Sequence, residues 1–66
     1  MELVINENAQ EFKSPMTVAQ LLQELELAGK PVAVELNLEL IPRDEHPSTE
    51  LKDGDRLEIV SLTGGG

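Results

Sequence analysis

The residues with the clearest chemical potential are three consecutive glycines at the end of the sequence, Gly64, Gly65 and Gly66. Glycine loses more conformational entropy on ordering than any other residue, so three in a row are poorly suited to a folded core. A strip without side chains can instead enter a channel too narrow for any Cβ, and it presents the α-carboxylate of Gly66 without hindrance. A carboxylate is a poor acyl electrophile, but its mixed anhydride with AMP is a good one.

Activation of that kind requires ATP and Mg²⁺ on a second protein, because this sequence has no nucleotide-binding motif. Neither Lys-Ser/Thr nor a helix follows the glycines, as a phosphate-binding loop requires. We therefore expect no cofactor bound to this chain. The other interpretation of a glycine run at a chain end is a frayed segment without function. The order of elements and the direct passage from a strand into the glycines favour the chemical interpretation.

Composition argues against several other classes of function. Five Lys and Arg against thirteen Asp and Glu give a formal net charge of −8, which disfavours binding to nucleic acid and to anionic membrane surfaces. We find no apolar run of the ~20 residues that span a bilayer and no secretory signal. The absence of Cys removes disulfide and thiolate chemistry. We expect a cytoplasmic chain, monomeric when free, and too small at 66 residues to enclose an enzyme's cleft.

Two further groups of polar residues are weak candidates for sites. His46 follows Asp44 and Glu45, but one His beside two carboxylates lacks the second ligand-bearing segment of a metal site. We expect a solvated loop there. The segment over residues 53–55 lacks the further ligands of a calcium loop, and we expect a turn. The sequence thus predicts neither a metal site nor catalytic residues.

Apolar periodicity predicts the elements in the first half of the chain. A strand over residues 2–6 turns through Asn6-Glu7-Asn8 into a short return strand over 9–12. A helix follows, since Val18, Leu21, Leu22 and Leu25 have the spacing of one helix face. Three features bear on its ends: Thr17 and Gln20 as a capping box, Ser14-Pro15 as a competing start, and Gly29 as the stop. Leu27 falls off the apolar face, so either the last turn is irregular or this side chain is exposed.

The second half changes to a period of two. We expect a strand over 32–36, a turn at Asn37-Leu38, and a short strand at Leu40-Ile41 that Pro42 ends. A polar loop over 43–50, an isolated apolar anchor at Leu51 and a tight turn at 53–55 come next. The last strand covers residues 56–62.

This order of elements predicts an α+β fold, because one helix can cover only one face of a small mixed sheet. The chain would be a sheet packed on one main helix. The core residues we expect are Leu3, Ile5, Val18, Leu21, Leu22, Leu25, Val32, Val34, Leu57 and Ile59.

Length, element order and the glycine end together resemble the sulfur carrier proteins of thiamine biosynthesis, the ThiS family, which have the ubiquitin-like β-grasp fold. The resemblance covers the whole chain. Its specific segments are Thr17-Val18-Ala19-Gln20-Leu21-Leu22, Val32-Ala33-Val34-Glu35-Leu36-Asn37, Ile41-Pro42-Arg43, Leu51-Lys52-Asp53-Gly54-Asp55-Arg56-Leu57 and the final Gly65-Gly66. There are two departures: Leu38 stands where the family usually has Gly, and Thr63 precedes three glycines rather than two.

The resemblance implies a β-grasp domain over 1–62 and a flexible glycine tail over 63–66. In such carriers an E1-like enzyme adenylates the terminal carboxylate, here that of Gly66. A sulfur-donor relay, usually a persulfide from a cysteine desulfurase, displaces AMP and leaves a thiocarboxylate, whose sulfur thiazole synthase consumes. Gly64 and Gly65 would lengthen the chain without adding side chains, so that it fits within the partner's channel. The chain would be a protein cosubstrate, not the catalyst.

Partner docking requires a surface beside the tail. Val60 and Leu62 lie on the non-core face of the last strand, and Thr63 connects them to the glycines. We expect these three residues to dock the partner, the alternative being that the apolar pair packs on strand neighbours or turns partly inward. The excess of acidic side chains favours a partner with a basic surface. The alternative is that this charge only keeps the protein soluble. Two other functions stay open: a sulfur carrier for molybdopterin or cysteine synthesis, and a non-carrier interaction module that ends in glycine.

Overall fold

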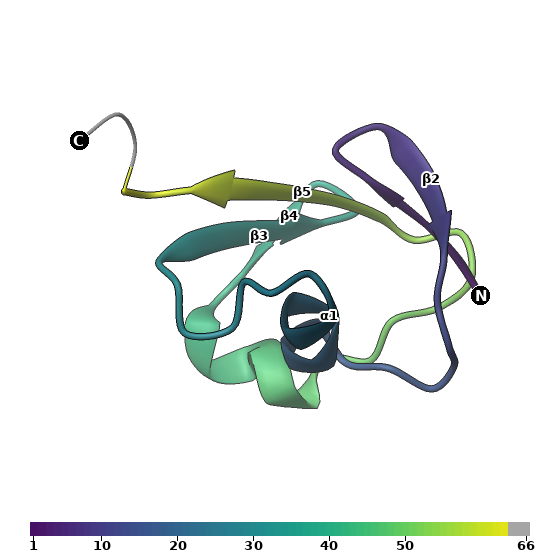
Figure 1. Cartoon of the computed structure of the whole chain (residues 1–66), viewed down its shortest axis with the longest axis horizontal. Helices are drawn as coiled ribbons and strands as arrows, with labels where there is room; N and C mark the ends of the chain where they lie inside the picture. Colours follow the sequence, from purple (N-terminus) through teal and green to yellow (C-terminus); the bar gives the residue numbers. More distant parts are fainter. Residues whose placement is uncertain (64–66) are drawn as a thin grey trace.

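The computed structural model describes residues 1–63, which form a mixed sheet with one α-helix against one face (Figure 1). The strands are β1 (Glu2–Ile5), β2 (Asn8–Glu11), β3 (Val32–Leu36), β4 (Glu39–Ile41) and β5 (Arg56–Ser61). They lie side by side in the order β2-β1-β5-β3-β4. The helices are α1 (Val18–Glu24) and the 3-10 helix η1 (Arg43–Ser48). Within residues 1–63, none of the helices has the length and apolar character needed to cross a membrane.

The centre of the sheet is the parallel pair of β1 and β5, with Val4 beside Arg56 and Ile5 beside Leu57. The other strand pairs are antiparallel. Both hairpins close through two-residue turns with positive φ at each central position: 48° and 72° at Asn6 and Glu7, and 51° and 72° at Asn37 and Leu38. Such turns match the right-handed twist of the strands that they join. Both predicted turns are therefore confirmed.

The start of α1 confirms the predicted capping box. The Oγ1 atom of Thr17 accepts from the Gln20 backbone N–H at 3.2 Å, and Oε1 of Gln20 accepts from the Thr17 N–H at 2.9 Å. Each side chain satisfies a backbone donor that the first helical turn leaves without a partner. The helix consequently begins at Val18, and the competing start at Ser14-Pro15 is wrong.

The end of α1 differs from the prediction that Gly29 stops it. The helix ends at Glu24, and Glu26 takes the left-handed conformation with φ 61°. The Glu26 N–H donates to Gln23 O at 3.0 Å and the Leu27 N–H to Leu22 O at 2.7 Å, the two bonds of a Schellman motif. Leu27 packs against the core as a result. Of the two explanations for why Leu27 falls off the apolar helix face, the irregular last turn is therefore confirmed.

The core lies between α1 and the inner face of the sheet, and the expected residues lie in or beside it. Leu3, Ile5, Val18, Leu21, Leu22, Val34 and Leu57 are buried. Leu25, Val32 and Ile59 are half-buried against them. The core also contains Met16 and the predicted anchor Leu51, whose N–H donates to Met16 O at 2.8 Å.

The segment after β4 is more ordered than the sequence predicts. Residues 43–48 form η1 instead of an irregular loop, and the side chain of His46 is only 6% exposed. Its Nε2 donates to the carbonyl oxygen of Ile41 at 3.1 Å. The prediction of a solvated His46 is therefore wrong, because an imidazole can be buried once a ring nitrogen has a hydrogen-bond partner.

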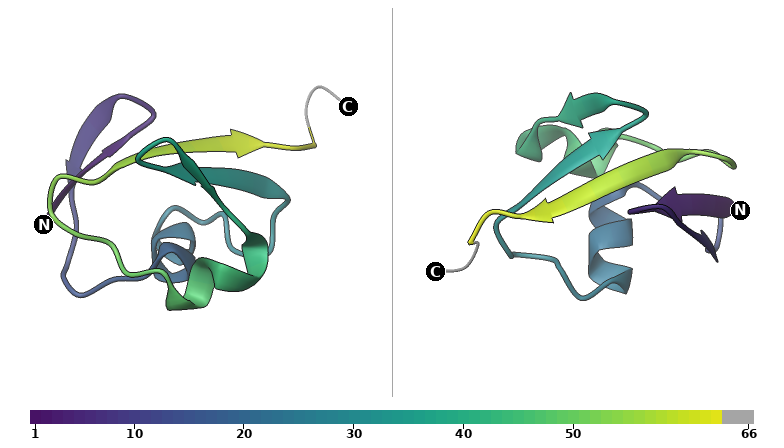
Figure 2. Two further views of the ribbon diagram at one scale, coloured as in Figure 1. Left: turned by 180° about the vertical axis from the view of Figure 1, so that it is seen from behind. Right: turned by 90° about the horizontal axis from the view of Figure 1, so that it is seen from above.

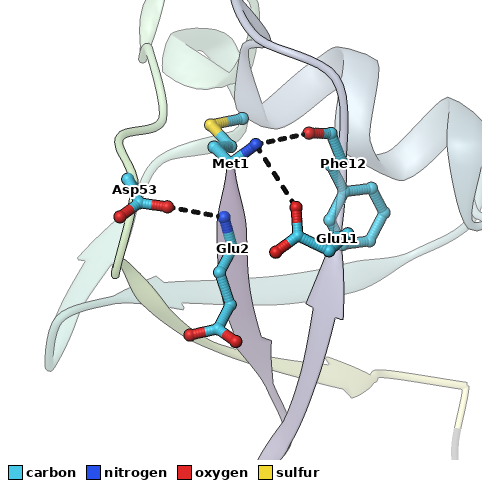
Figure 3. Close-up of polar contacts among 5 residues, drawn as sticks. All are labelled: Met1, Glu2, Glu11, Phe12 and Asp53. Carbon is cyan, nitrogen blue, oxygen red and sulfur yellow. Dashed lines mark hydrogen bonds and ion pairs between the residues drawn. The ribbon is translucent and has the colours of Figure 1, made fainter.

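Polar contacts around Met1 join the first strand to its neighbours (Figure 3). Its amino group donates to Phe12 O at 2.7 Å and lies 3.7 Å from Oε1 of Glu11. The Glu2 N–H donates to Oδ1 of Asp53 at 2.7 Å. These contacts connect β1 both to the edge strand β2 and to the turn that leads into β5.

The turn at Leu38 generates a stability prediction. A left-handed conformation costs roughly 1–2 kcal/mol for a residue with a Cβ, and this side chain is 92% exposed, so packing offsets little of that strain. We expect Leu38→Gly to raise the free energy of unfolding by about 1 kcal/mol in urea denaturation. Leu38→Ala is the control, because it shortens the exposed side chain but keeps the Cβ. An equal gain in both variants would contradict a backbone origin.

Candidate functional site

The candidate site is the end of β5, which leads the chain out of the sheet. Figures 1 and 2 show this strand continuing past the helix toward the C-terminal end of the molecule. On one side it stays joined to β3: Ala33 pairs with Val60, Val32 with Ser61, and the Leu62 N–H donates to Pro31 O at 2.8 Å. The path of the chain is therefore fixed by the sheet up to Leu62.

On its other side β5 is bound by an asparagine side chain. The Asn6 N–H donates to Leu57 O at 2.9 Å, after which β1 turns away from β5. The side-chain amide of Asn6 then takes the place of a strand: its Oδ1 accepts from the Ile59 N–H at 2.8 Å, and its Nδ2 donates to Ile59 O at 3.2 Å. Asn6 thus extends the parallel pairing by one residue with a side chain.

A second turn asparagine binds the start of the same strand. Oδ1 of Asn37 accepts from the Arg56 N–H at 3.0 Å, and its Nδ2 donates to Oδ1 of Asp55 at 3.0 Å. Sequence reasoning identified both asparagines as turn residues but missed their bonds to β5. The signal in the sequence for these bonds was an asparagine at the first position of each left-handed turn. The turn conformation alone already explains an asparagine at that position.

The predicted docking residues lie where the sequence places them. Val60 and Leu62 point away from the core and are 55% and 65% exposed. Thr63 follows them, with its Oγ1 atom 2.9 Å from Oγ of Ser61. Because both side chains are more than half exposed, the alternative that they turn inward is wrong. Their docking role stays a prediction, as does the boundary between a domain over 1–62 and a tail over 63–66. Gly64, Gly65 and Gly66 lie outside the described residues.

The outer face of the sheet, away from α1, carries negative charge beside these apolar side chains. Glu35 and Glu58 are directly paired across β3 and β5, and both are exposed. Like charges in this position repel each other. Among residues 1–63 the only ion pair joins the amino group of Met1 to Glu11. This face therefore suits a partner that brings positive charge.

Within residues 1–63, the side chains able to bind a metal do not gather at one place. No group of three or more His, Asp or Glu side chains in this part of the chain could hold a metal ion. The buried His46 is engaged by a backbone carbonyl. The features gathered at one end of the sheet are instead an exposed apolar pair and the chain leading to the glycines.

These features define a class of protein. A mixed sheet with parallel central strands, in the order β2-β1-β5-β3-β4 around one helix, is the ubiquitin-like β-grasp fold, as predicted. Residues 1–66 match the model of the ThiS family, and the chain belongs to that family.

Individual relatives agree with this assignment. The chain is 41% identical over 54 residues to the sulfur carrier protein ThiS of Bacillus subtilis, covering 82% of each chain, and 26% identical over the full length of its Escherichia coli counterpart. The crystal structure of the thiamine biosynthesis protein ThiS from Geobacter metallireducens superposes with a TM-score of 0.85 at 35% identity, covering all of both chains.

A longer relative is also similar. The chain is 47% identical, over all of its 66 residues, to part of a thiazole synthase from Paramagnetospirillum magneticum, and it spans 20% of that protein.

The Asn6 contacts generate a second stability prediction. Asn6→Gly keeps a residue that accepts positive φ but removes both side-chain bonds to Ile59, so we expect a loss of about 1 kcal/mol in the free energy of unfolding. Amide exchange measured by NMR should accelerate at Ile59. The control is Glu7→Gly in the same turn, which leaves those two bonds intact. Unchanged exchange at Ile59 in Asn6→Gly would refute the role assigned to this amide.

Proposed function

We propose that this chain is a sulfur carrier for the synthesis of the thiamine thiazole, and that Gly66 carries the sulfur. The observation that carries the proposal is the junction at the end of β5, where an exposed apolar pair on a strand fixed by the sheet leads directly to three glycines. Membership of the ThiS family supports it over the whole length.

In the proposed reaction the carboxylate of Gly66 is first activated and then converted to a thiocarboxylate. A carboxylate oxygen of Gly66 attacks the α-phosphorus of ATP on an E1-like adenylating enzyme, and pyrophosphate leaves. The terminal sulfur of a persulfide, made by a cysteine desulfurase, attacks the acyl carbon, and AMP leaves. A thiol then cleaves the S–S bond of the resulting acyl disulfide and releases the thiocarboxylate. On thiazole synthase the sulfur passes to the acceptor, and an oxygen atom from the acceptor or from water replaces it on the acyl carbon, which regenerates the carboxylate.

This chain supplies the sulfur-bearing carboxylate and the docking surface, and its partners supply the catalytic groups. ATP and Mg²⁺ belong to the adenylating enzyme. Gly64 and Gly65 lack Cβ atoms, which lets the end of the chain enter a narrow channel. Val60, Leu62 and Thr63 contact the partner next to the channel entrance. A structure free of cysteine fits a reducing compartment, and we propose that the cycle operates in the cytoplasm.

The central test of this function is conversion of Gly66. After incubation with ATP, Mg²⁺, an E1-like adenylating enzyme, a cysteine desulfurase and cysteine, intact mass should show one oxygen exchanged for one sulfur. Replacing both Gly65 and Gly66 by Ala should abolish the exchange, because Cβ atoms obstruct the channel. Removing one glycine is the matched control: it leaves Gly-Gly at the end and should preserve conversion. A wild-type chain that never gains sulfur would rule out the proposal.

The docking role of the apolar pair has its own test. We expect Val60→Thr with Leu62→Ser to raise the KM of adenylation for the carrier about tenfold, since contact area worth about 1.4 kcal/mol is lost. The free energy of unfolding should change little because both side chains are exposed. Leu40→Thr removes an apolar side chain that is 64% exposed on β4 and should affect KM much less. Equal effects at both places would argue against a docking surface confined to β5.

A further inference from the structure

The side of β5 that faces β1 is left open before the chain reaches the glycines. β1 pairs with β5 only at Arg56 and Leu57, and the Asn6 side chain extends this pairing to Ile59. On the opposite side, β3 accompanies β5 through the pair of Val32 and Ser61. The last part of β5 therefore has a neighbouring strand on one side only.

The hydrogen-bond pattern shows which backbone groups are free on that open side. In an antiparallel pair, residues alternate between those bonded to the opposite strand and those whose backbone groups point away from it. Leu62 is bonded to Pro31, so its neighbour Ser61, opposite Val32, points its N–H and C=O away from β3. This is the direction in which Ile59 meets Asn6. Within residues 1–63 nothing pairs with these two groups of Ser61, which is an exposed residue.

The same stretch of β5 has two chemically different faces. Val60 and Leu62 form an apolar outer face, while the hydroxyls of Ser61 and Thr63, 2.9 Å apart, form a polar face on the other side. A strand lying along this open edge would therefore match it with apolar side chains on one face and polar side chains on the other. An exposed edge of this kind is a template for an added strand.

We propose that thiazole synthase supplies an extended segment that pairs with the open edge of β5 at Ser61, in the place that β1 has left. This inference rests on the proposed function. It commits to thiazole synthase because a relative of this chain forms one fifth of a thiazole synthase. Pairing at Ser61 would fix the direction of the chain three residues before Gly64, which sulfur transfer from Gly66 requires.

The other edges of the sheet are less suited to this task. β2 and β4 are the outermost strands, and neither leads into the glycines. An added strand at either edge would not determine where the end of the chain points. The open edge at Ser61 is continuous with the tail itself.

The test removes the Ser61 N–H without removing an internal hydrogen bond. Because this N–H points away from β3, Ser61→Pro should leave the fold intact, as proline is tolerated at strand edges. We expect titration calorimetry to show about tenfold weaker binding to purified thiazole synthase, the effect of one backbone bond together with a disturbed edge. Ser61→Ala keeps the N–H and removes only the hydroxyl, so it should weaken binding much less than Ser61→Pro does. If the proline variant does not fold, a synthetic chain with N-methylated Ser61 replaces it.

Amide exchange locates the contact directly. In the complex with thiazole synthase, the Ser61 amide should exchange at least tenfold more slowly than in the free chain. Unchanged exchange together with unchanged binding of Ser61→Pro would overturn the inference. So would protection of Ser61 by self-association, seen as a concentration-dependent sedimentation coefficient, or protection by the adenylating enzyme alone. Sulfur loading of Gly66, measured by mass on the same wild-type sample, tests the proposed function separately, because binding at Ser61 does not require a loaded carrier.

Discussion

The structure depends on how its central strand is paired. β5 is bonded along most of its length by β3 on one side and by β1 with the Asn6 amide on the other, and its side chains Leu57 and Ile59 pack into or against the core. In the proposed function, the same strand also delivers the end of the chain to another protein. The structure meets both demands by making the pairing asymmetric, so that the β1 side ends at Ile59 while the β3 side continues to Leu62.

This asymmetry separates stability from function along a single strand. In the first half of β5 the inward-facing Leu57 is buried in the core that α1 covers, so substitutions of that residue act on folding. The second half is exposed on its outer face and contributes little apolar burial. Val60 and Leu62 are the exposed apolar side chains of this half, and the proposed docking role would account for their exposure. Glu35 and Glu58 lie as a like-charged pair on the same outer face, with Arg56 two residues before Glu58 on β5.

The sequence predicted most of this arrangement because local rules and tertiary packing agree. The capping box at Thr17, the two left-handed turns and the alternation in β3 and β5 each follow from neighbouring residues. The predictions are wrong where a contact outside the local segment determines the conformation. Burial of Leu27 moved the helix stop from Gly29 to Glu26, and a carbonyl of Ile41 allowed His46 to be buried. The bonds from Asn6 to Ile59 span most of the chain, and no local pattern announces them.

For the candidate site the division is similar. A period of two predicts that Leu57 and Ile59 share the core face of β5 and that Val60 and Leu62 share the outer face. The glycines are visible in the sequence itself. Which backbone groups of β5 lack a partner could not be predicted, because that depends on the register of three strands and on where β1 turns away.

The bond between Leu62 and Pro31 also sets a geometric limit on any enzyme that uses this chain. It is the last backbone bond to the sheet within the described residues, and four residues follow Leu62 in the sequence. Fully extended, four residues span at most ~14 Å. With Gly66 as the proposed sulfur-bearing residue, the partner's reactive centre would lie no deeper than about that distance below the surface that receives the sheet. The spacing between Leu62 and Gly66 would thus limit the depth of the channel in any enzyme that uses this residue.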